Sequence, residues 1–252
     1  MLVEARDIVD GVRVLALNRP PANAISGDFL EALGEQCKAA SEDDRVRAVI
    51  VTGNDRFFSG GLDLKEASSG ASRVGNLAGT SNDGIFMLWT LPKPTVAMVN
   101  SHAIAGGVII ALACDFRITQ SGNHRFGLNE VAIGMGFPRG AFEIARLALT
   151  NQQLRWTLLE AGLFDVNRAH ELGIVDEIVE PGRLESRCIE VAKRLAANGR
   201  LAYAHTKRRI QAEAVVRALN QDQDEARELA HIGQSDESRA LLAAQVKALT
   251  NR

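Results

Sequence analysis

The segment Met98–Thr119, MVNSHAIAGGVIIALACDFRIT, decides the fold. Its pattern predicts a buried strand that ends near Val99, a tight turn at Ala105-Gly106-Gly107, and an apolar segment from Val108 to Ala113. Two consecutive glycines allow a sharp turn and let a ligand approach the backbone without meeting a Cβ atom. If a helix begins there, the amides of Gly106 and Gly107 are unpaired donors at the positive end of its dipole, which suits a developing negative charge. A packing turn between two buried elements explains the segment equally well.

A second predicted strand leads into a similar glycine turn. Residues 47–52, RAVIVT, form a β-branched apolar run that predicts a buried strand, and Gly53 ends it. The chain then reaches Phe58-Ser59-Gly60-Gly61-Leu62. If the two turns meet in the fold, they offer two backbone donors to a single oxygen atom.

The composition indicates one sizeable core in a chain of 252 residues. The hydrophobic share of 46% and the charged share of 24% are ordinary for a globular protein, and a net charge of −2 argues against nucleic-acid or membrane-surface binding driven by bulk charge. Cys37, Cys114 and Cys188 are widely spaced and form no CxxC pair, which favours reduced cysteines and a cytoplasmic location. We find neither a secretory signal pattern nor an apolar run of membrane-spanning length.

The chain alternates predicted strands and helices and ends in helices alone. Asp10-Gly11 predicts a hairpin within residues 2–17, and Ser26 is placed to cap a helix from Gly27 to about Ala40. Further strands are expected at 47–52, 95–99, 115–120 and 174–179, an extended piece at 124–127, and helices at 85–90, 141–149, 152–161 and 166–172. From Leu184 onward the pattern is helical, with Gly199 and Gly233 as breaks. The Gly- and Ser-rich stretch 66–84 predicts a loop or a poorly ordered helix, placed to act as a lid.

Five motifs carry a resemblance to a known family, in the same order and with comparable spacing. They are Asn18-Arg19-Pro20 with Asn23-Ala24; Phe58-Ser59-Gly60-Gly61-Leu62-Asp63-Leu64-Lys65; Lys93-Pro94 with Val99-Asn100, Ala105-Gly106-Gly107 and Cys114-Asp115; Phe126-Gly127 with Glu130 and Gly134; and Ala169 to Val175. Over essentially its whole length the chain resembles the crotonase superfamily, the enoyl-CoA hydratase/isomerase family.

The resemblance implies an α/β fold of the crotonase-like (ClpP/crotonase) type, a spiral of ββα units with a C-terminal helical region. We expect a spiral core at residues 1–190 with the acyl-CoA site, and a helical trimerisation region at 191–252. The expected assembly is a homotrimer or a hexamer built as a dimer of trimers. The implied ligand is an acyl-CoA thioester, with coenzyme A as part of the substrate and no separate cofactor.

The resemblance also assigns site residues. The thioester oxygen would lie between the backbone amides of Leu62 and Gly106, the same two turns that the glycine pattern indicates. The remaining expected contacts with the substrate are Ala22, Ala24, Gly61, Asp63, Leu64, Lys65 and Ile109. Lys65 is a candidate phosphate contact, and a solvated surface lysine is the alternative interpretation.

The departures from the family pattern bear on the reaction. Hydratases of the family use two catalytic glutamates; the second matches Glu130, but Ile109 occupies the position of the first. An apolar side chain cannot hold the attacking water, whereas some isomerases of the family work with one glutamate in a similar local sequence. The resemblance therefore favours 3,2-enoyl-CoA isomerisation with Glu130 as the single acid/base. The alternatives are a hydratase whose second carboxylate comes from Glu143 or the 66–84 stretch, and a non-catalytic acyl-CoA binder.

Other chemistries find little support in the sequence. His102 and His124 match no catalytic position of the family, and core or surface roles are expected for both. The stretch Phe58-Ser59-Gly60-Gly61 lacks the G-x-S-x-G frame of serine hydrolases. The spacing of His, Cys, Asp and Glu predicts no metal site, and Gly134-Met135-Gly136 does not complete a dinucleotide-binding motif.

Overall fold

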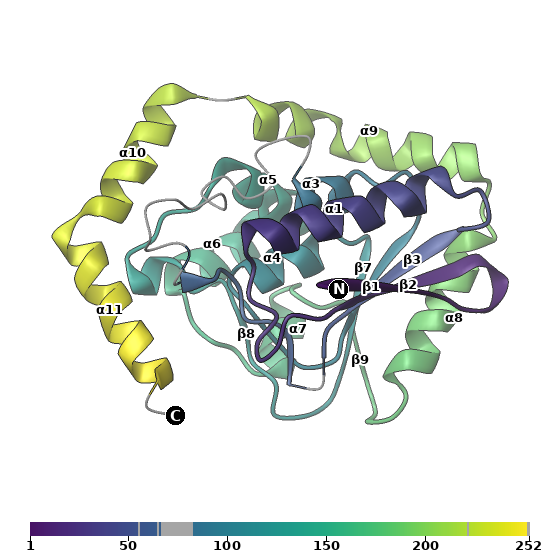
Figure 1. Cartoon of the computed structure of the whole chain (residues 1–252), viewed down its shortest axis with the longest axis horizontal. Coiled ribbons are helices and arrows are strands. Elements are labelled where there is room, and N and C mark those ends of the chain that lie inside the picture. The colour runs from purple at the N-terminus through teal and green to yellow at the C-terminus, as the bar shows by residue number, and fades with distance from the viewer. Residues whose placement is uncertain (55, 65, 67–82, 221, 251–252) are drawn as a thin grey trace.

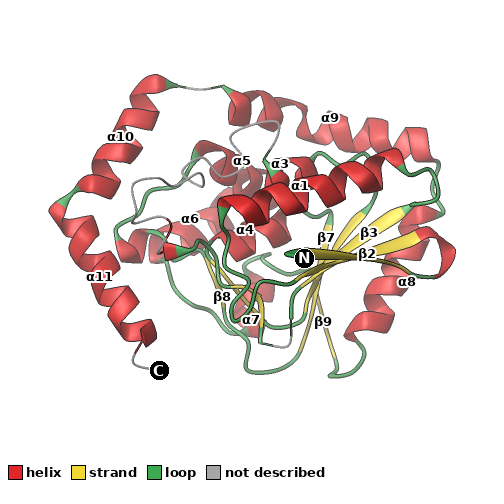
Figure 2. Ribbon diagram, in the orientation of Figure 1, coloured by secondary structure: helices red, strands yellow, loops and turns green. Residues whose placement is uncertain are grey.

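The computed structural model describes the chain apart from residues 55, 65, 67–82, 221 and 251–252. The predicted lid at 66–84 therefore lies almost entirely outside the described residues. Figures 1 and 2 show an α/β core with a long helix, α9 Arg200–Leu219, along one side, followed by α10 Gln223–Gln234 and α11 Asp236–Thr250 at one end of the molecule. Within the described residues, no helix has the length and hydropathy needed to cross a lipid bilayer.

Among the described residues, six strands form the larger sheet, in the order β1-β2-β3-β5-β7-β9. Their bounds are β1 Val3–Asp7, β2 Val12–Leu17, β3 Ala48–Thr52, β5 Thr95–Val99, β7 Phe116–Gln120 and β9 Glu177–Val179. The β1–β2 pair is the predicted antiparallel hairpin, with the short 3-10 helix η1 Val9–Gly11 at its turn, and the other neighbours pair in parallel. Strands β3 and β5 are buried along their whole length, which explains why they read as continuous apolar runs.

The two faces of the larger sheet are covered by different helices. One face carries Val14, Ile50 and Met98, which pack against α8 Leu184–Ala196. The alternate residues, including Leu15 and Val51, face the main core with α1 Gly27–Glu42, α3 Gly84–Trp89 and α4 Gly106–Leu112. This division follows from the period of two along each strand.

Three short parallel strands form a second sheet among the described residues, in the order β4-β6-β8. Their bounds are β4 Phe57–Ser59, β6 His102–Ile104 and β8 Phe126–Gly127. The register pairs Ser59 with Ala103, and Ala103 with Phe126. Since parallel strands end at the same edge, the segments that follow β4, β6 and β8 emerge together, and this edge carries the candidate site.

The remaining described helices are η2 Val131–Ile133, α5 Arg139–Ala148, α6 Asn151–Glu160 and α7 Val166–Glu171. The chain turns back on itself after α9, and α11 packs against η2 of the same chain. The Ser238 hydroxyl donates to the carbonyl oxygen of Gly134, directly beyond η2. The predicted domain boundary at residues 190/191 falls within α8.

Most predicted elements are present, with two corrections. Ser26 caps α1 by accepting from the Phe29 N–H, and the helical pattern breaks at Gly199, directly before α9, as expected. However, Gly233 lies inside α10, and the helical pattern breaks instead at Ser235 and around Asn220. The segment between β5 and the Gly106 turn is also not a plain connection, because it contains β6.

Candidate active site

The two glycine turns lie against each other. A Cβ atom built on Gly61 would lie 3.2 Å from the Gly106 nitrogen and 2.7 Å from the Ala105 Cβ. Such an approach is possible only because residue 61 has no side chain, and its φ of +85° also favours glycine. The structure therefore brings together the two segments that the sequence predicts as backbone donors.

The amides of the first turn are bonded within the protein, with one exception. Gly60 N–H donates to the Ala22 carbonyl oxygen at 2.8 Å, Gly61 N–H to the Ser59 hydroxyl at 3.3 Å, and Asp63 N–H to the Ile25 carbonyl oxygen at 2.9 Å. Within the described part of the chain, the Leu62 amide has no hydrogen-bond partner. It is thus available to a ligand.

The second turn begins helix α4. Ala105 has φ 53° and ψ −126°, a conformation that costs about 1–3 kcal/mol for a residue with a side chain. Its carbonyl oxygen accepts from Val108 N–H at 2.9 Å, so the helix starts at once. The Gly106 N–H also has no partner among the described residues and stands at the positive end of α4. Leu62 and Gly106 thus have the free amides that an oxyanion hole needs.

Hydrogen bonds from the loop before α1 hold the first turn in place. The fully buried side chain of Asn23 donates to the carbonyl oxygens of Phe57 and Phe58 and accepts from the Arg19 N–H. The Arg19 guanidinium donates to the Ala24 carbonyl oxygen at 3.0 Å and to the Asp63 carboxylate at 2.6 Å. The first and second motifs therefore form one bonded unit.

Glu130 follows β8 at the same edge of the smaller sheet. Its side chain is buried, and its Oε2 has no hydrogen-bond partner among the described residues. Burial raises its pKa from 4.5 to about 7. A carboxylate with a pKa near neutrality is well suited to accept and return a proton at physiological pH.

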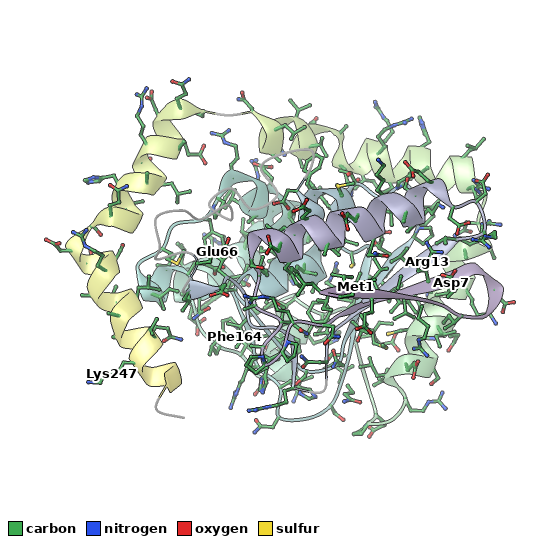
Figure 3. The ribbon with its side chains drawn as sticks, viewed as in Figure 1. Met1, Asp7, Arg13, Glu66, Phe164 and Lys247 are labelled. Atoms are coloured by element: carbon green, nitrogen blue, oxygen red, sulfur yellow. The ribbon has the colours of Figure 1, made fainter. Side chains whose placement is uncertain are left out.

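No second carboxylate occupies the position that the family's hydratases use. Ile109 lies in α4, one helical turn beyond Gly106, and is 1% exposed. The buried carboxylate of Glu143 accepts from Arg217 Nε at 2.8 Å and from Arg146 at 3.2 Å. Glu66 accepts from the Gly27 N–H at 3.2 Å, and Figure 3 shows it beside the N-terminal end of α1. Asp83, the other carboxylate of the 66–84 stretch, accepts from the Ile85 and Phe86 N–H groups at the start of α3, so each of these three carboxylates is bonded to another part of the protein.

The other predicted contacts have mixed placements. Ala22, Ala24 and Leu64 are half-buried and border the bonded unit of the two motifs. Asp63 is half-buried and forms an ion pair with Arg19. Lys65, the candidate phosphate contact, lies outside the described residues.

His102 and His124 lie away from this edge, and the thiols of Cys37 and Cys114 are unreactive. His102 begins β6 and His124 precedes β8, so both lie at the amino ends of strands whose carboxyl ends reach the site. Burial raises the pKa of Cys37 to about 12 and that of Cys114 further, which keeps both thiols protonated. Among the described residues, no three His, Cys, Asp or Glu side chains gather as metal ligands would.

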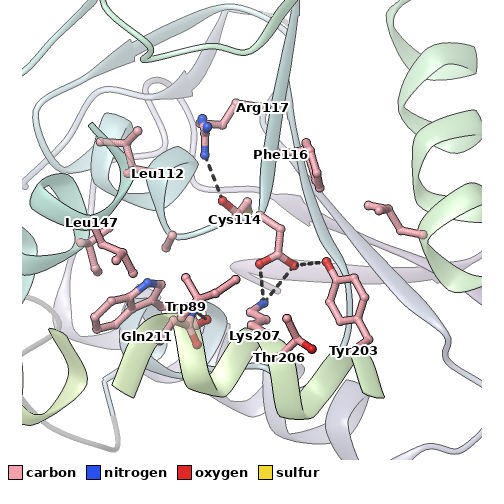
Figure 4. A pocket seen from close by; sticks show the side chains of 16 residues that line it. Trp89, Leu112, Cys114, Phe116, Arg117, Leu147, Tyr203, Thr206, Lys207 and Gln211 are labelled. Atoms are coloured by element: carbon pink, nitrogen blue, oxygen red, sulfur yellow. Dashed lines mark hydrogen bonds and ion pairs between the residues drawn. The ribbon is translucent and has the colours of Figure 1, made fainter. Parts of the chain in front are cut away.

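A pocket of about 430 Å³ lies at the opposite end of α4 from Gly106, between β7, α5 and α9 (Figure 4). Three of its polar side chains form a cluster: Lys207 and Tyr203 each contact the Asp115 carboxylate at 3.0 Å, as the dashed lines in Figure 4 show. It holds neither Glu130 nor the free amides, so we do not assign the chemistry to it.

Comparison with known proteins agrees with this geometry. The family model described as "Enoyl-CoA hydratase/isomerase" matches residues 7–248. The short-chain-enoyl-CoA hydratase of Clostridium acetobutylicum is 32% identical over 220 residues, which are 85% of this chain and 81% of that protein. The chain belongs to the enoyl-CoA hydratase/isomerase family, within the crotonase superfamily.

Solved structures give the same fold. A Mycobacterium tuberculosis structure described as an enoyl-CoA isomerase is 30% identical, with a TM-score of 0.76 over 91% of this chain and 98% of that chain. The same protein is also described as a probable enoyl-CoA hydratase. Human mitochondrial delta3-delta2-enoyl-CoA isomerase has a TM-score of 0.89 over 100% of this chain and 99% of the other, but at 24% identity it shows the crotonase fold alone.

Two residues that organise the site were not predicted from the sequence. Ser59 is assigned no role by the glycine-turn pattern, and Asn23 enters only as part of a motif. Asn is one of the few residues that tolerate a positive φ, and Asn23 has φ 49°. An asparagine between a Pro-Pro pair and a helix cap is the one local signal of this role.

Proposed function

We propose that the protein isomerises 3-enoyl-CoA to 2-enoyl-CoA. The observation that carries this proposal is the pairing of a single buried, high-pKa glutamate, Glu130, with a buried Ile109 in place of a second carboxylate. Isomerisation needs one group that removes a proton from C2 and returns it to C4, and it needs no water. Hydration needs a water held and activated, a task that two carboxylates share in the family's hydratases.

In the proposed mechanism, the thioester oxygen accepts hydrogen bonds from the Leu62 and Gly106 amides. Each such donor is typically worth about 2.7–4 kcal/mol in the transition state. Glu130 in its ionised form takes the C2 proton, and the negative charge moves to the thioester oxygen. Glu130 then delivers the proton to C4 as the double bond shifts. The apolar side chain of Ile109 would exclude water from the intermediate.

A hydratase is the second candidate, because hydratases predominate among the named sequence relatives, such as the one from Clostridium acetobutylicum. It would need a carboxylate in the role of the missing glutamate. Glu143 is disfavoured for that role by its two arginine partners. Product analysis with 3-enoyl-CoA and 2-enoyl-CoA of several chain lengths separates the two reactions. Absence of turnover with every substrate would instead favour the remaining alternative, a non-catalytic acyl-CoA binder.

The proposed substrate carries coenzyme A, and no further cofactor is invoked. We also propose a homotrimer or a hexamer as the assembly. Helix α9 presents Leu201, Ile210 and Val216 with exposed fractions of 87%, 65% and 69%, more apolar surface than an isolated helix face needs. Light scattering at micromolar concentration tests this, and a stable monomer would contradict it.

A further inference from the structure

Ser59, the last residue of β4, lies fully buried where three segments meet. Its hydroxyl donates to the Asn23 carbonyl oxygen at 2.8 Å and accepts from the Gly61 N–H at 3.3 Å. On its other side, a Cβ atom on Gly107 would lie 2.2 Å from the Ser59 carbonyl oxygen. Ser59 therefore touches the loop before α1, the first glycine turn and the first turn of α4.

Hydrogen bonds hold the Gly61 residue on both of its sides. The Ser59 hydroxyl binds the Gly61 N–H, and the Ile25 N–H donates to the Gly61 carbonyl oxygen at 2.8 Å. In a trans peptide the carbonyl and the following N–H point in opposite directions. Because the Gly61 carbonyl points toward Ile25, the Leu62 N–H must point away from it. The direction of the free amide is thus set by bonds one residue earlier.

We propose that Ser59 is a positioning residue: its hydroxyl holds the Gly61 N–H while the Ile25 N–H holds the Gly61 carbonyl oxygen, so that the backbone of Gly61 is restricted on both sides and the Leu62 amide is aimed at the substrate's thioester oxygen. Glycine at position 61 is needed for the turn, yet it is the residue with the greatest backbone freedom. A hydroxyl that binds its N–H removes that freedom. The inference rests on the oxyanion hole of the proposed function, and it holds whether isomerisation or hydration follows.

The arrangement also excludes a nucleophilic role for Ser59. The hydroxyl proton is given to the Asn23 carbonyl oxygen, and the side chain has no exposed surface. No described basic side chain makes a hydrogen bond with it. Its contribution to the reaction is therefore transmitted through the Leu62 amide.

Ser59→Ala is the direct test. It leaves the Gly61 N–H without its partner and loosens the backbone of Gly61, although the Ile25 N–H still holds the Gly61 carbonyl oxygen. Deleting a whole oxyanion donor costs about 10²- to 10³-fold in kcat; loosening one should cost less, and we expect a fall of about tenfold. The hydrogen bond from the Leu62 amide strengthens as negative charge develops on the thioester oxygen in the transition state. KM should therefore stay within about twofold of the wild-type value. Ser59→Cys, whose thiol is a weak donor and acceptor, should recover part of the loss.

Thr119→Val is the matched control. Thr119 in β7 is also fully buried, and its hydroxyl donates to the Val99 carbonyl oxygen at 2.7 Å. The substitution removes a similar buried hydrogen bond from the larger sheet. We expect it to lower the unfolding temperature while kcat stays within about twofold of the wild type.

A spectroscopic readout separates positioning from stability. The probe is 4-dimethylaminocinnamoyl-CoA, whose absorbance moves to longer wavelength when its carbonyl oxygen accepts hydrogen bonds. We expect a red shift on binding to the wild type and to Thr119→Val, a reduced shift with Ser59→Ala, and an intermediate one with Ser59→Cys. If Ser59→Ala does not fold, Ser59→Cys decides by the same comparison.

A folded Ser59→Ala, or Ser59→Cys in its place, that keeps the full shift and the full kcat would overturn the inference. So would a Thr119→Val that loses as much of the shift as Ser59→Ala. Absence of any red shift with the wild type would contradict both the proposed oxyanion hole and the role of Ser59. A wild type that shows the shift but hydrates instead of isomerising would contradict only the proposed reaction, and the Ser59 comparison would still stand.

Discussion

Gly61 approaches Gly106 so closely that a Cβ atom at position 61 would lie 3.2 Å from the Gly106 nitrogen. Two strands of the smaller sheet, β4 and β6, create this approach by ending at the same edge. The amides of Leu62 and Gly106 are left without partners among the described residues, while those of Gly60, Gly61, Asp63 and Ala105 are bonded. The geometry of the site therefore depends on the absence of a side chain at one position.

Gly61→Ala should abolish the function of this pair of amides. The new Cβ would lie 2.7 Å from the Ala105 Cβ and 2.8 Å from the Ile104 carbonyl oxygen, at a φ of +85°. We expect kcat to fall by at least about 100-fold, the effect of losing one oxyanion donor. Gly182→Ala is the control, because Gly182 has φ +81° but no atom within 4 Å of its Cβ position. It should cost about 1–2 kcal/mol of stability and leave kcat unchanged. Equal activities of the two variants would contradict the assignment.

Glu130→Gln should remove the acid/base while keeping the shape of the side chain. We expect turnover to fall by about two to four orders of magnitude, with little change in acyl-CoA affinity. Glu143→Gln is the matched control, since Glu143 is another buried carboxylate, one held by Arg146 and Arg217. It should lower stability and spare kcat. Steady-state kinetics on both variants tests this prediction. Near-normal turnover in Glu130→Gln would refute the mechanism.

The raised pKa of Glu130 predicts how activity and stability change with pH. The ionised carboxylate is the base, so kcat/KM should rise with pH through about 7. The folded state binds the proton more tightly than the unfolded state, where the pKa is near 4.5. The unfolding free energy should therefore fall as pH rises from about 4.5 to about 7, by about 3 kcal/mol at most.

Denaturant unfolding of the wild type and Glu130→Gln tests the stability half of this prediction. The Gln variant carries no titrating group at this position. It should be the more stable protein at pH 8, and its advantage should shrink toward pH 5. The same stability difference at both pH values would show that Glu130 titrates with an ordinary pKa.

Ile109→Glu should introduce hydratase activity. A carboxylate at this position would admit a water between two acidic groups, and hydration of crotonyl-CoA should appear or rise. Burying the charge should lower stability, and the two carboxyl groups should push one pKa upward. Ile109→Gln is the control, because it admits water without adding a base. Equal hydration rates in the two variants would show that the second carboxylate is not the missing element.

The sequence predicted the fold well where local signals were strong. Ser26 with the helix that it caps, and the buried runs of β3 and β5, are patterns that short windows contain. The strand at His102–Ile104 was missed because three residues show no periodicity and its pairing partners lie far away in the sequence. The break after Asn220 was missed because no glycine or proline marks it.

The approach of the two glycine turns was predictable from the sequence, but the contacts that support them were not. Gly61 and Gly106 are visible as glycines that follow strands, and the family resemblance places Glu130. The role of Ser59 depends on the Asn23 carbonyl oxygen, which lies in a different segment. Likewise, the sequence does not show that Glu143 has a partner, because Arg217 of α9 contacts it only in the folded chain. Such contacts arise only from the tertiary structure.

The most direct test of the proposed reaction gives the wild-type enzyme 3-hexenoyl-CoA and crotonyl-CoA in parallel, with Glu130→Gln as the blank, and identifies the products by chromatography. We expect conversion of 3-hexenoyl-CoA to 2-hexenoyl-CoA, slowed at least about 100-fold in Glu130→Gln. Hydration of crotonyl-CoA should be far slower than this isomerisation. Formation of 3-hydroxybutyryl-CoA at a rate equal to or above that of isomerisation would contradict the assignment of Ile109 and Glu130 to a single-base isomerase.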